Sequence, residues 1–200
     1  MSIRKLLATA LAVVTFTVAY AYEPTVSDPV VIVTSYNPDV KSISDNLAAF
    51  TEAYSKSGCQ NPIILENMHC LNLSECLRWK NRLWNLLEKY YADGKQPAAI
   101  VLLGTEASSS YFSISQPVLK ETPVIFGMRG DNMALLPEYG VNLAEWQPES
   151  YYLTQDFKDY NIVGGLVYEY DIEKSLALID NLKTKIDTLA FISDNTFGGV

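Results

Sequence analysis

Histidine and the familiar catalytic turn motifs are missing, or nearly so, from this 200-residue chain. His69 is the only histidine, so Ser108 in the run Ser108–Ser110 has no obvious general base. No GxSxG turn, P-loop or GxGxxG fingerprint occurs, and the carboxylates show no telling spacing. We therefore predict that the chain is not an enzyme and needs no cofactor. A hydrolase on a doubly wound α/β scaffold is the alternative from the enzyme class.

Cysteines are few and lack the spacing of a metal site. Cys59, Cys70 and Cys76 include no CxxC pair, so we expect no metal although His69 adjoins Cys70. In an oxidising compartment the three cysteines allow one disulfide and leave one thiol over. Cys59–Cys70 and Cys70–Cys76 both fit the sequence, and the spacing does not choose between them.

Basic residues are outnumbered, with 15 against 23 acidic residues, and the formal net charge is −8. The basic residues form no stripe along the chain. An acidic chain of this kind argues against binding to nucleic acid and against docking on anionic membranes.

Long apolar runs are missing except at the amino terminus. There, Arg4-Lys5 precedes the apolar stretch Leu6–Val18, and Ala19-Tyr-Ala21 provides small residues for a cleavage site. This pattern predicts a secretory signal peptide at residues 1–21. An uncleaved anchor is the alternative, but the stretch is shorter than the roughly 20 residues that span a bilayer. Cleavage would leave 13 basic and 23 acidic residues, a charge of −10, on an exported, periplasmic or extracytoplasmic protein.

The rest of the chain alternates short β-branched runs with amphipathic segments. The runs are continuously apolar, which is typical of strands buried on both faces of a parallel sheet. They lie at Val30–Thr34, Ile63–Leu65, Ala98–Leu103 and Thr122–Phe126. Strands that alternate with helices predict an α/β fold, a Rossmann-like parallel sheet flanked by helices with right-handed crossovers.

Helices are predicted between these strands. Ser42–Asp45 resembles a capping box that starts the first helix, and Gly58 is a natural stop for it. Asn72 or Ser74 could cap the second helix, and Tyr111–Leu119 predicts a short third one. Each helix would carry the chain from one strand to the next across a face of the sheet.

The last third of the chain predicts a second, incomplete unit. Asn132–Asp159 is irregular and rich in aromatic residues, and we expect it to lead out of the first sheet. Asn161–Val167 and Thr188–Ile192 then predict two strands of a second sheet, which is too small to cover itself. The predicted organisation is a signal peptide at 1–21, a first lobe with its connector at 22–159, and an incomplete second lobe at 160–200.

Small and polar residues follow the predicted strands, where ligands of open α/β sheets bind. The candidate site residues in these loops are Ser35, Tyr36, Asn37, Gly104, Thr105, Glu106, Gly127 and Arg129. Gly104 permits a close backbone approach to a ligand, or serves a simple turn. Tyr36 could stack on a ring or pack over the sheet edge. Arg129 could clamp a carboxylate or pair with Asp131.

The opening strand and loop, Val31–Pro38, resemble those of type 1 periplasmic-binding-protein-like domains. Four later segments resemble further parts of such domains in the expected order: Leu103–Ala107, Pro123–Gly127, Asn161–Ile172 and Ile192–Gly198. The closest resemblance is to the branch related to ABC-transporter substrate-binding proteins, whose relatives also serve as extracytoplasmic sensor regions of bacterial histidine kinases. The resemblance implies two Rossmann-like lobes that close on a ligand. It places in the cleft Ser35, Tyr36, Gly104, Thr105, Glu106, Gly127 and Asn195.

These observations together predict an exported small-molecule-binding module. It would be the extracytoplasmic sensor region, or a fragment, of a bacterial signal-transduction protein such as a sensor histidine kinase. A solute-binding component of an ABC transporter is the alternative. The loop side chains suit a small polar or aromatic ligand. A homodimer or a downstream membrane signalling region is the expected macromolecular partner, and nucleic acid is not.

Overall fold

The computed structural model describes residues 24–168 and 172–181, together with Thr188, Ala190, Ile192 and Phe197. The predicted signal peptide, Asn195 and part of the predicted strand Thr188–Ile192 lie outside the described residues. Within the described residues, no helix is both long and apolar enough to span a membrane.

Five parallel strands form the central sheet, in the order β2-β1-β3-β4-β7. Their bounds are β1 Val30–Thr34, β2 Ile63–Asn67, β3 Ala99–Leu103, β4 Val124–Gly130 and β7 Ile162–Tyr168. The sheet confirms the predicted α/β fold with a Rossmann-like parallel sheet. Because β2 and β3 lie on opposite sides of β1, the strand order reverses between β1 and β3. Doubly wound sheets bind ligands at such a switch point, beyond the carboxyl ends of the strands.

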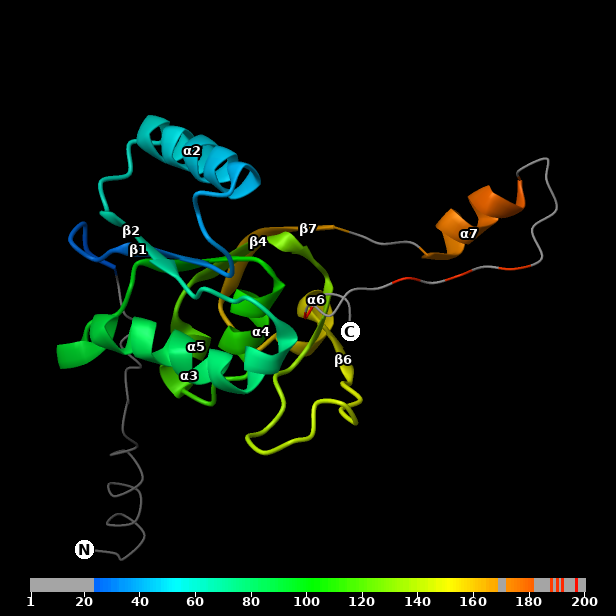
Figure 1. Cartoon of the computed structure of the whole chain (residues 1–200). Helices are drawn as coiled ribbons and strands as arrows, with labels where there is room; N and C mark the ends of the chain where they lie inside the picture. Colours follow the sequence, from blue (N-terminus) through cyan, green and yellow to red (C-terminus); the bar gives the residue numbers. More distant parts are fainter. Residues whose placement is uncertain are drawn as a thin grey trace, which may run out of the picture.

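Helices lie on both faces of this sheet (Figure 1). One face carries α2 (Lys41–Lys56), and the other carries α3 (Cys76–Leu87), α4 (Thr105–Phe112) and α5 (Pro117–Glu121). Alternate residues of β1 serve the two faces, since Ile32 packs in the cluster that contains residues of α2 and Val33 packs in the larger cluster on the other side. Burial on both faces explains why this strand is continuously apolar.

The first helix begins differently from the prediction. α2 starts at Lys41, and its N-cap residue Val40 forms no side-chain cap bond, so the predicted capping box at Ser42–Asp45 is wrong. Asn37 causes the difference, because its Oδ1 accepts the Asp39 N–H at 3.0 Å and turns the chain into the helix early. At the other end, Gly58 adopts φ +78° just beyond the C-cap, as the predicted stop requires.

Three single-turn 3-10 helices flank α3. They are η1 (Leu73–Glu75), η2 (Glu88–Tyr90) and η3 (Ala92–Gly94). Asn72 and Ser74 form no side-chain cap for α3, and instead the Ser74 hydroxyl donates to Asn72 Oδ1. The predicted caps at these two positions are therefore wrong, because the two side chains satisfy each other.

The helix after β3 starts earlier than the sequence predicts. α4 begins at Thr105, directly after Gly104, instead of near Tyr111. Its serines obscure it in the sequence because serine is a modest helix former. Within the helix, Ser108 and Ser110 donate their hydroxyls to carbonyls one turn back, at 3.0 and 2.6 Å. These bonds let the serines be buried without loss of hydrogen bonding.

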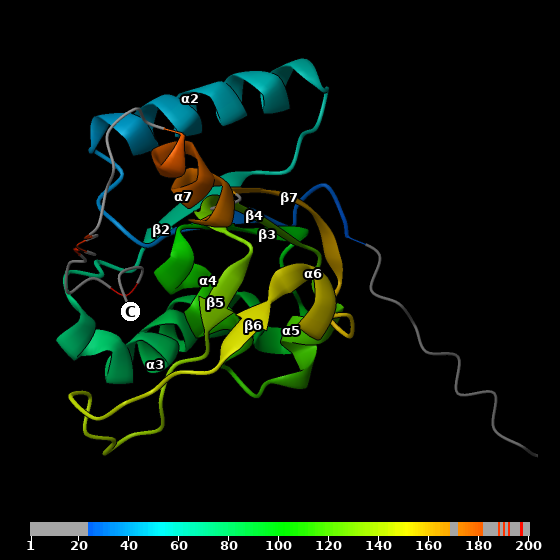
Figure 2. The same cartoon turned by 90° about the vertical axis from the view of Figure 1, so that its right-hand side faces the viewer.

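The connector Asn132–Asp159 returns to the first sheet instead of leading out of it. It contains the antiparallel pair β5 (Asn132–Ala134) and β6 (Ser150–Tyr152), followed by α6 (Leu153–Asp156). This ribbon packs beside α4 (Figure 2). Phe157, which follows α6, packs in a tilted arrangement against Phe112 of α4, with ring centroids 4.4 Å apart. The aromatic residues of the connector thus cover the core.

The strand predicted to open a second sheet belongs to the first. β7 pairs in parallel with β4 and completes the five-stranded sheet, so that prediction is wrong. The physical reason is that β4 would otherwise expose an unpaired edge, and the connector brings the chain back to that edge. α7 (Ile172–Asp180) follows β7 and stands away from the sheet in Figure 1. The second lobe stays a prediction.

Candidate functional site

Four of the predicted site residues lie together at the switch point between β1 and β3. Ser35 and Tyr36 directly follow β1, Gly104 directly follows β3, and Glu106 lies in the first turn of α4. The two strands are hydrogen-bonded neighbours with Thr34 opposite Leu103, so their carboxyl ends bring the four residues side by side. Ser35, Tyr36 and Gly104 lie at strand ends as the sequence predicts, whereas Glu106, predicted in a loop, lies in the first turn of α4.

Ser35 and Gly104 fix the start of α4. The buried Ser35 Oγ accepts the N–H of Ala107 at 2.9 Å and so caps a helix that begins 70 residues later. Gly104 has φ +104° and ψ 161°, a region of backbone conformation that is essentially restricted to glycine. A Cβ on Gly104 would lie 2.4 Å from Ser35 Oγ. The helix therefore depends on a glycine at 104 and a small hydroxyl residue at 35.

Glu106 is a buried carboxylate with one oxygen in use and one free. Its side chain is almost wholly inaccessible, with 2% of the residue exposed. Oε1 accepts the hydroxyl of Tyr36, whereas Oε2 has no hydrogen-bond partner among the described residues. Oε2 lies 3.6 Å from the point where a Gly104 Cβ would stand, so the free oxygen is turned toward the strand ends. The N-terminus of α4 favours a negative charge at this position.

Cys70 joins this site from the loop after β2. Its backbone N–H donates to the Ser35 carbonyl at 2.8 Å. Burial and the nearby Glu106 carboxylate raise the pKa of the Cys70 thiol above its ordinary value, and Arg82 only partly opposes them. Cys70 is therefore a neutral thiol at physiological pH and an inert wall of the site.

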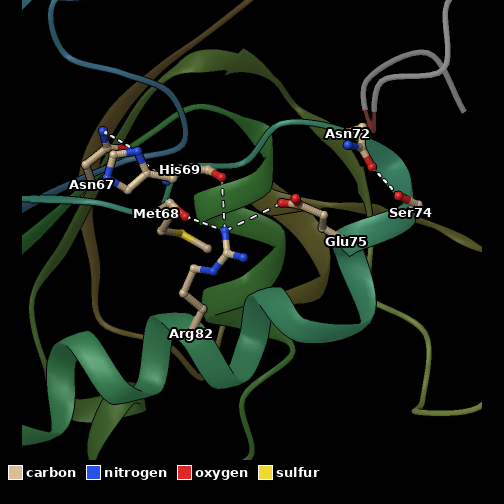
Figure 3. A network of polar contacts seen from close by, with 7 residues as sticks. All are labelled: Asn67, Met68, His69, Asn72, Ser74, Glu75 and Arg82. Atoms are coloured by element: carbon tan, nitrogen blue, oxygen red, sulfur yellow. Dashed lines mark hydrogen bonds and ion pairs between the residues drawn. The ribbon is translucent and has the colours of Figure 1, made fainter.

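Arg82 of α3 holds the neighbouring loop (Figure 3). Its Nη1 donates to the carbonyls of Met68 at 2.7 Å and His69 at 3.0 Å, and lies 3.6 Å from Glu75 Oε2. Asn67 supports the same loop, because its Oδ1 accepts the His69 N–H at 2.8 Å where His69 has φ +51°. The guanidinium is thus committed to the loop and to Glu75, and forms no ion pair with Glu106.

Four buried side-chain atoms in the described part of the chain lack a hydrogen-bond partner, and all four come from the α3 and α4 region. They are Glu75 Oε2, Trp79 Nε1, Glu106 Oε2 and Ser109 Oγ. Glu75, in η1 at the N-cap of α3, lies one turn before Trp79, and Glu106 lies one turn before Ser109 in α4. α3 packs against α4. Buried polar atoms ordinarily find a partner in the protein, in water or in a ligand. The sequence gives no sign of either role, because Trp79 resembles an ordinary helix residue and Ser109 falls in the loop predicted before Tyr111.

Arg129 stabilises a turn of the chain, as Asn37 does before α2. The buried Arg129 donates to the carbonyls of Gly130 at 2.7 Å and Asn132 at 3.0 Å, and to Met133 Sδ at 3.2 Å. Burial lowers the pKa of Arg129 to about 10, against the opposing effect of Asp131, so the guanidinium stays charged at neutral pH. Its donors hold the turn between β4 and β5, which leaves neither a carboxylate clamp nor the predicted side-chain pair with Asp131.

Gly127 lies on the opposite face of the sheet, beside an apolar groove of about 370 Å³. The groove runs between α2 and the strands β3, β4 and β7, with Leu47, Phe50 and Leu166 among its lining residues. Met128 also lines it, and adopts φ +58° where β4 shifts register against β7. Gly127 contacts the Ser35–Glu106 network only through its backbone, where its carbonyl accepts the Gly104 N–H at 3.0 Å.

The remaining candidate residues fall into no second cluster. Thr105 is the first residue of α4 and is half-buried. All three cysteines are free thiols, so neither disulfide that the sequence allows is formed. In the described ranges, no group of three or more histidine, cysteine and acidic residues is arranged to hold a metal ion. Asn195 lies outside those ranges.

Comparison of the chain with protein-family models, with curated proteins and with solved structures found no match in any of the three. The assignment to the Rossmann-like α/β class therefore depends on the strand order and on the helices that cover the two faces.

Proposed function

We propose that the chain is a small-molecule-binding module whose site lies at the β1–β3 switch point, and that its sheet is the first lobe of a type 1 periplasmic-binding-protein-like fold. The observation that carries the proposal is Glu106, a buried carboxylate with a free oxygen turned toward the strand ends. Buried charges in proteins are paired or hydrogen-bonded as a rule, so a free carboxylate oxygen at a ligand-binding position favours a role in binding.

Tyr36 supports the same proposal from the solvent side. The residue is 40% exposed although its hydroxyl donates to the buried Glu106. A partly exposed aromatic residue beside a buried polar group suits a ligand that combines an apolar body with a polar end. Such a ligand belongs to the small polar or aromatic class that the sequence suggests.

The biological setting in this proposal is an exported sensor module of a signal-transduction protein such as a sensor histidine kinase. Closure of the protein on a ligand would then bias a downstream membrane element. The alternative is a solute-binding component of an ABC transporter. The predicted signal peptide and the acidic charge suit both settings. A coding sequence that continues past Val200 into a transmembrane helix and a kinase region would favour the sensor.

A thermal-shift screen of the chain against a mixed panel of small metabolites tests the proposal. A ligand present at 100 times its dissociation constant stabilises by about 2.7 kcal/mol. For a domain of this size that corresponds to a rise in Tm of roughly 5–11 °C. Tyr36→Ala and Thr105→Ala are expected to reduce the shift, whereas Tyr139→Ala, at a residue 83% exposed, is the matched control. A panel in which no compound raises Tm contradicts the proposal.

A further inference from the structure

We infer that the ligand of this site carries a positively charged N–H group, a primary ammonium or an amidinium, which binds Glu106 Oε2. This inference rests on the proposed function and specifies the chemistry of its ligand. The free oxygen is an acceptor only, so whatever completes it must be a donor. A charged donor satisfies both the hydrogen bond and the charge.

The described part of the chain supplies no cation to this carboxylate. Among the described residues, no ion pair includes Glu106, and the only hydrogen bond to its carboxylate comes from the neutral Tyr36 hydroxyl. Arg82 is near, because its charge and that of Glu106 both affect the pKa of the Cys70 thiol. It contacts Glu75 and donates to two loop carbonyls instead. A buried carboxylate without a cation is costly, because burial removes its hydration without replacing it. A cationic ligand would compensate for that loss.

The direction of the free oxygen fits a ligand that enters between the strand ends. Oε2 lies 3.6 Å from the point where a Gly104 Cβ would stand, and Ser35 Oγ lies 2.4 Å from the same point. The Tyr36 hydroxyl donates to the other carboxylate oxygen. One turn further along α4, Ser109 Oγ is also buried and without a partner. Residues three apart lie on the same face of a helix, so Ser109 offers a second acceptor to a group with several N–H donors.

Ammonium and amidinium groups carry several N–H donors and a positive charge, whereas a carboxylate or a phosphate carries a negative charge. Anionic ligands would meet a like charge at Glu106, which opposes binding. A neutral alcohol could donate one hydrogen bond but would leave the buried charge uncompensated. The site therefore discriminates by charge as well as by hydrogen bonding.

Calorimetric titration with matched probes tests the inference on the 200-residue chain. The probes are benzylamine and benzamidine, with benzyl alcohol and benzoate as uncharged and anionic counterparts of similar size. We expect the two cations to bind at least roughly tenfold more tightly than benzyl alcohol, as a hydrogen bond to a charged group implies. Benzoate is expected to bind most weakly.

The variant Glu106→Gln keeps the shape of the side chain and removes its charge. Affinity for benzylamine is expected to fall roughly 10- to 100-fold, with affinity for benzyl alcohol unchanged. Glu138→Gln, at an exposed glutamate, is the matched control and leaves both affinities unchanged.

The outcomes separate this inference from the proposed function. The inference is overturned if the cations bind no better than benzyl alcohol, or if Glu106→Gln keeps its full affinity for benzylamine. In either case a positive metabolite screen leaves the proposed function standing. A negative metabolite screen overturns both. If Glu106→Gln does not fold, the preference of the unchanged chain for cations over benzyl alcohol decides the question.

Discussion

Replacement of Gly104 by alanine is expected to destabilise the fold by about 2–6 kcal/mol. The backbone conformation at φ +104° and ψ 161° costs a residue with a side chain about 1–3 kcal/mol. The new Cβ would also stand 2.4 Å from Ser35 Oγ and 2.8 Å from Ser35 Cβ, and overpacking of this kind adds about 1–3 kcal/mol. The lower limit of the sum corresponds to a fall in Tm of roughly 4–8 °C.

Equilibrium unfolding in urea measures the loss, and Gly140→Ala separates its two causes. Gly140 has a similar φ of +92° but no atom within 4 Å of its would-be Cβ, so its substitution reports backbone strain alone. The double variant Ser35→Gly, Gly104→Ala removes the side chain that clashes. Its destabilisation is expected to be smaller than the sum of the two single effects, because the residues are in direct contact.

Equal losses for Gly104→Ala and Gly140→Ala would refute the reasoning. They would mean that Ser35 does not approach Gly104 closely, and hence that the carboxyl ends of β1 and β3 do not meet as the structure places them. Strict additivity in the double variant would refute it in the same way.

Three further predictions concern the same region. Ser35→Ala should leave the Ala107 N–H buried and unpaired, which should lower the free energy of unfolding in urea by about 1–3 kcal/mol. Hydrogen exchange at that amide should become faster, and unchanged exchange would contradict the cap. Iodoacetamide at pH 8 should label the exposed Cys59 in the folded chain but spare Cys70, whose raised pKa and burial keep it a neutral thiol; mass spectrometry that finds equal labelling would contradict this. Trp79→Phe removes a buried N–H without a partner, so the free energy of unfolding should change by less than about 1 kcal/mol. Trp79→Ala should instead cost roughly 3–5 kcal/mol. A large loss in the phenylalanine variant would show that the indole N–H is bonded.

The local pattern of apolar residues was sufficient to predict the strands of the sheet. The continuous apolar run Val30–Thr34 became β1, buried on both faces as its composition predicts. The polar residues at its end, Ser35 and Tyr36, became part of the candidate site for the same reason, since the carboxyl ends of parallel strands are where ligands bind. The position of a strand or a loop depends on residues that are close together in the sequence, so the sequence alone predicts it.

Pairings between distant segments were not predictable in this way. Ser35 caps α4 from 72 residues away, so nothing near Thr105 signals that a helix begins there. β7 pairs with β4 although the connector Asn132–Asp159 separates them in the sequence. The apolar run of β7 suits the first sheet and a second sheet equally. Such choices depend on which edge is left unpaired, which is a property of the assembled fold.

The chemistry of the candidate site was visible only in part. The sequence marks Glu106 as a polar residue in a loop, whereas the structure buries it in a helix with one oxygen free. Arg129 is more conspicuous in the sequence, yet its donors hold the β4–β5 turn. Burial and hydrogen-bond partners decide the role of a charged side chain, and both depend on the assembled fold.

The central claim, that a ligand binds at the β1–β3 switch point, is tested most directly by an NMR titration. Amide signals of the ¹⁵N-labelled chain would be followed while the strongest compound of the metabolite screen is added. The account predicts the largest shifts at Tyr36, Gly104 and Glu106. Shifts concentrated instead at Leu47 and Gly165, which line the apolar groove on the other face of the sheet, would contradict it.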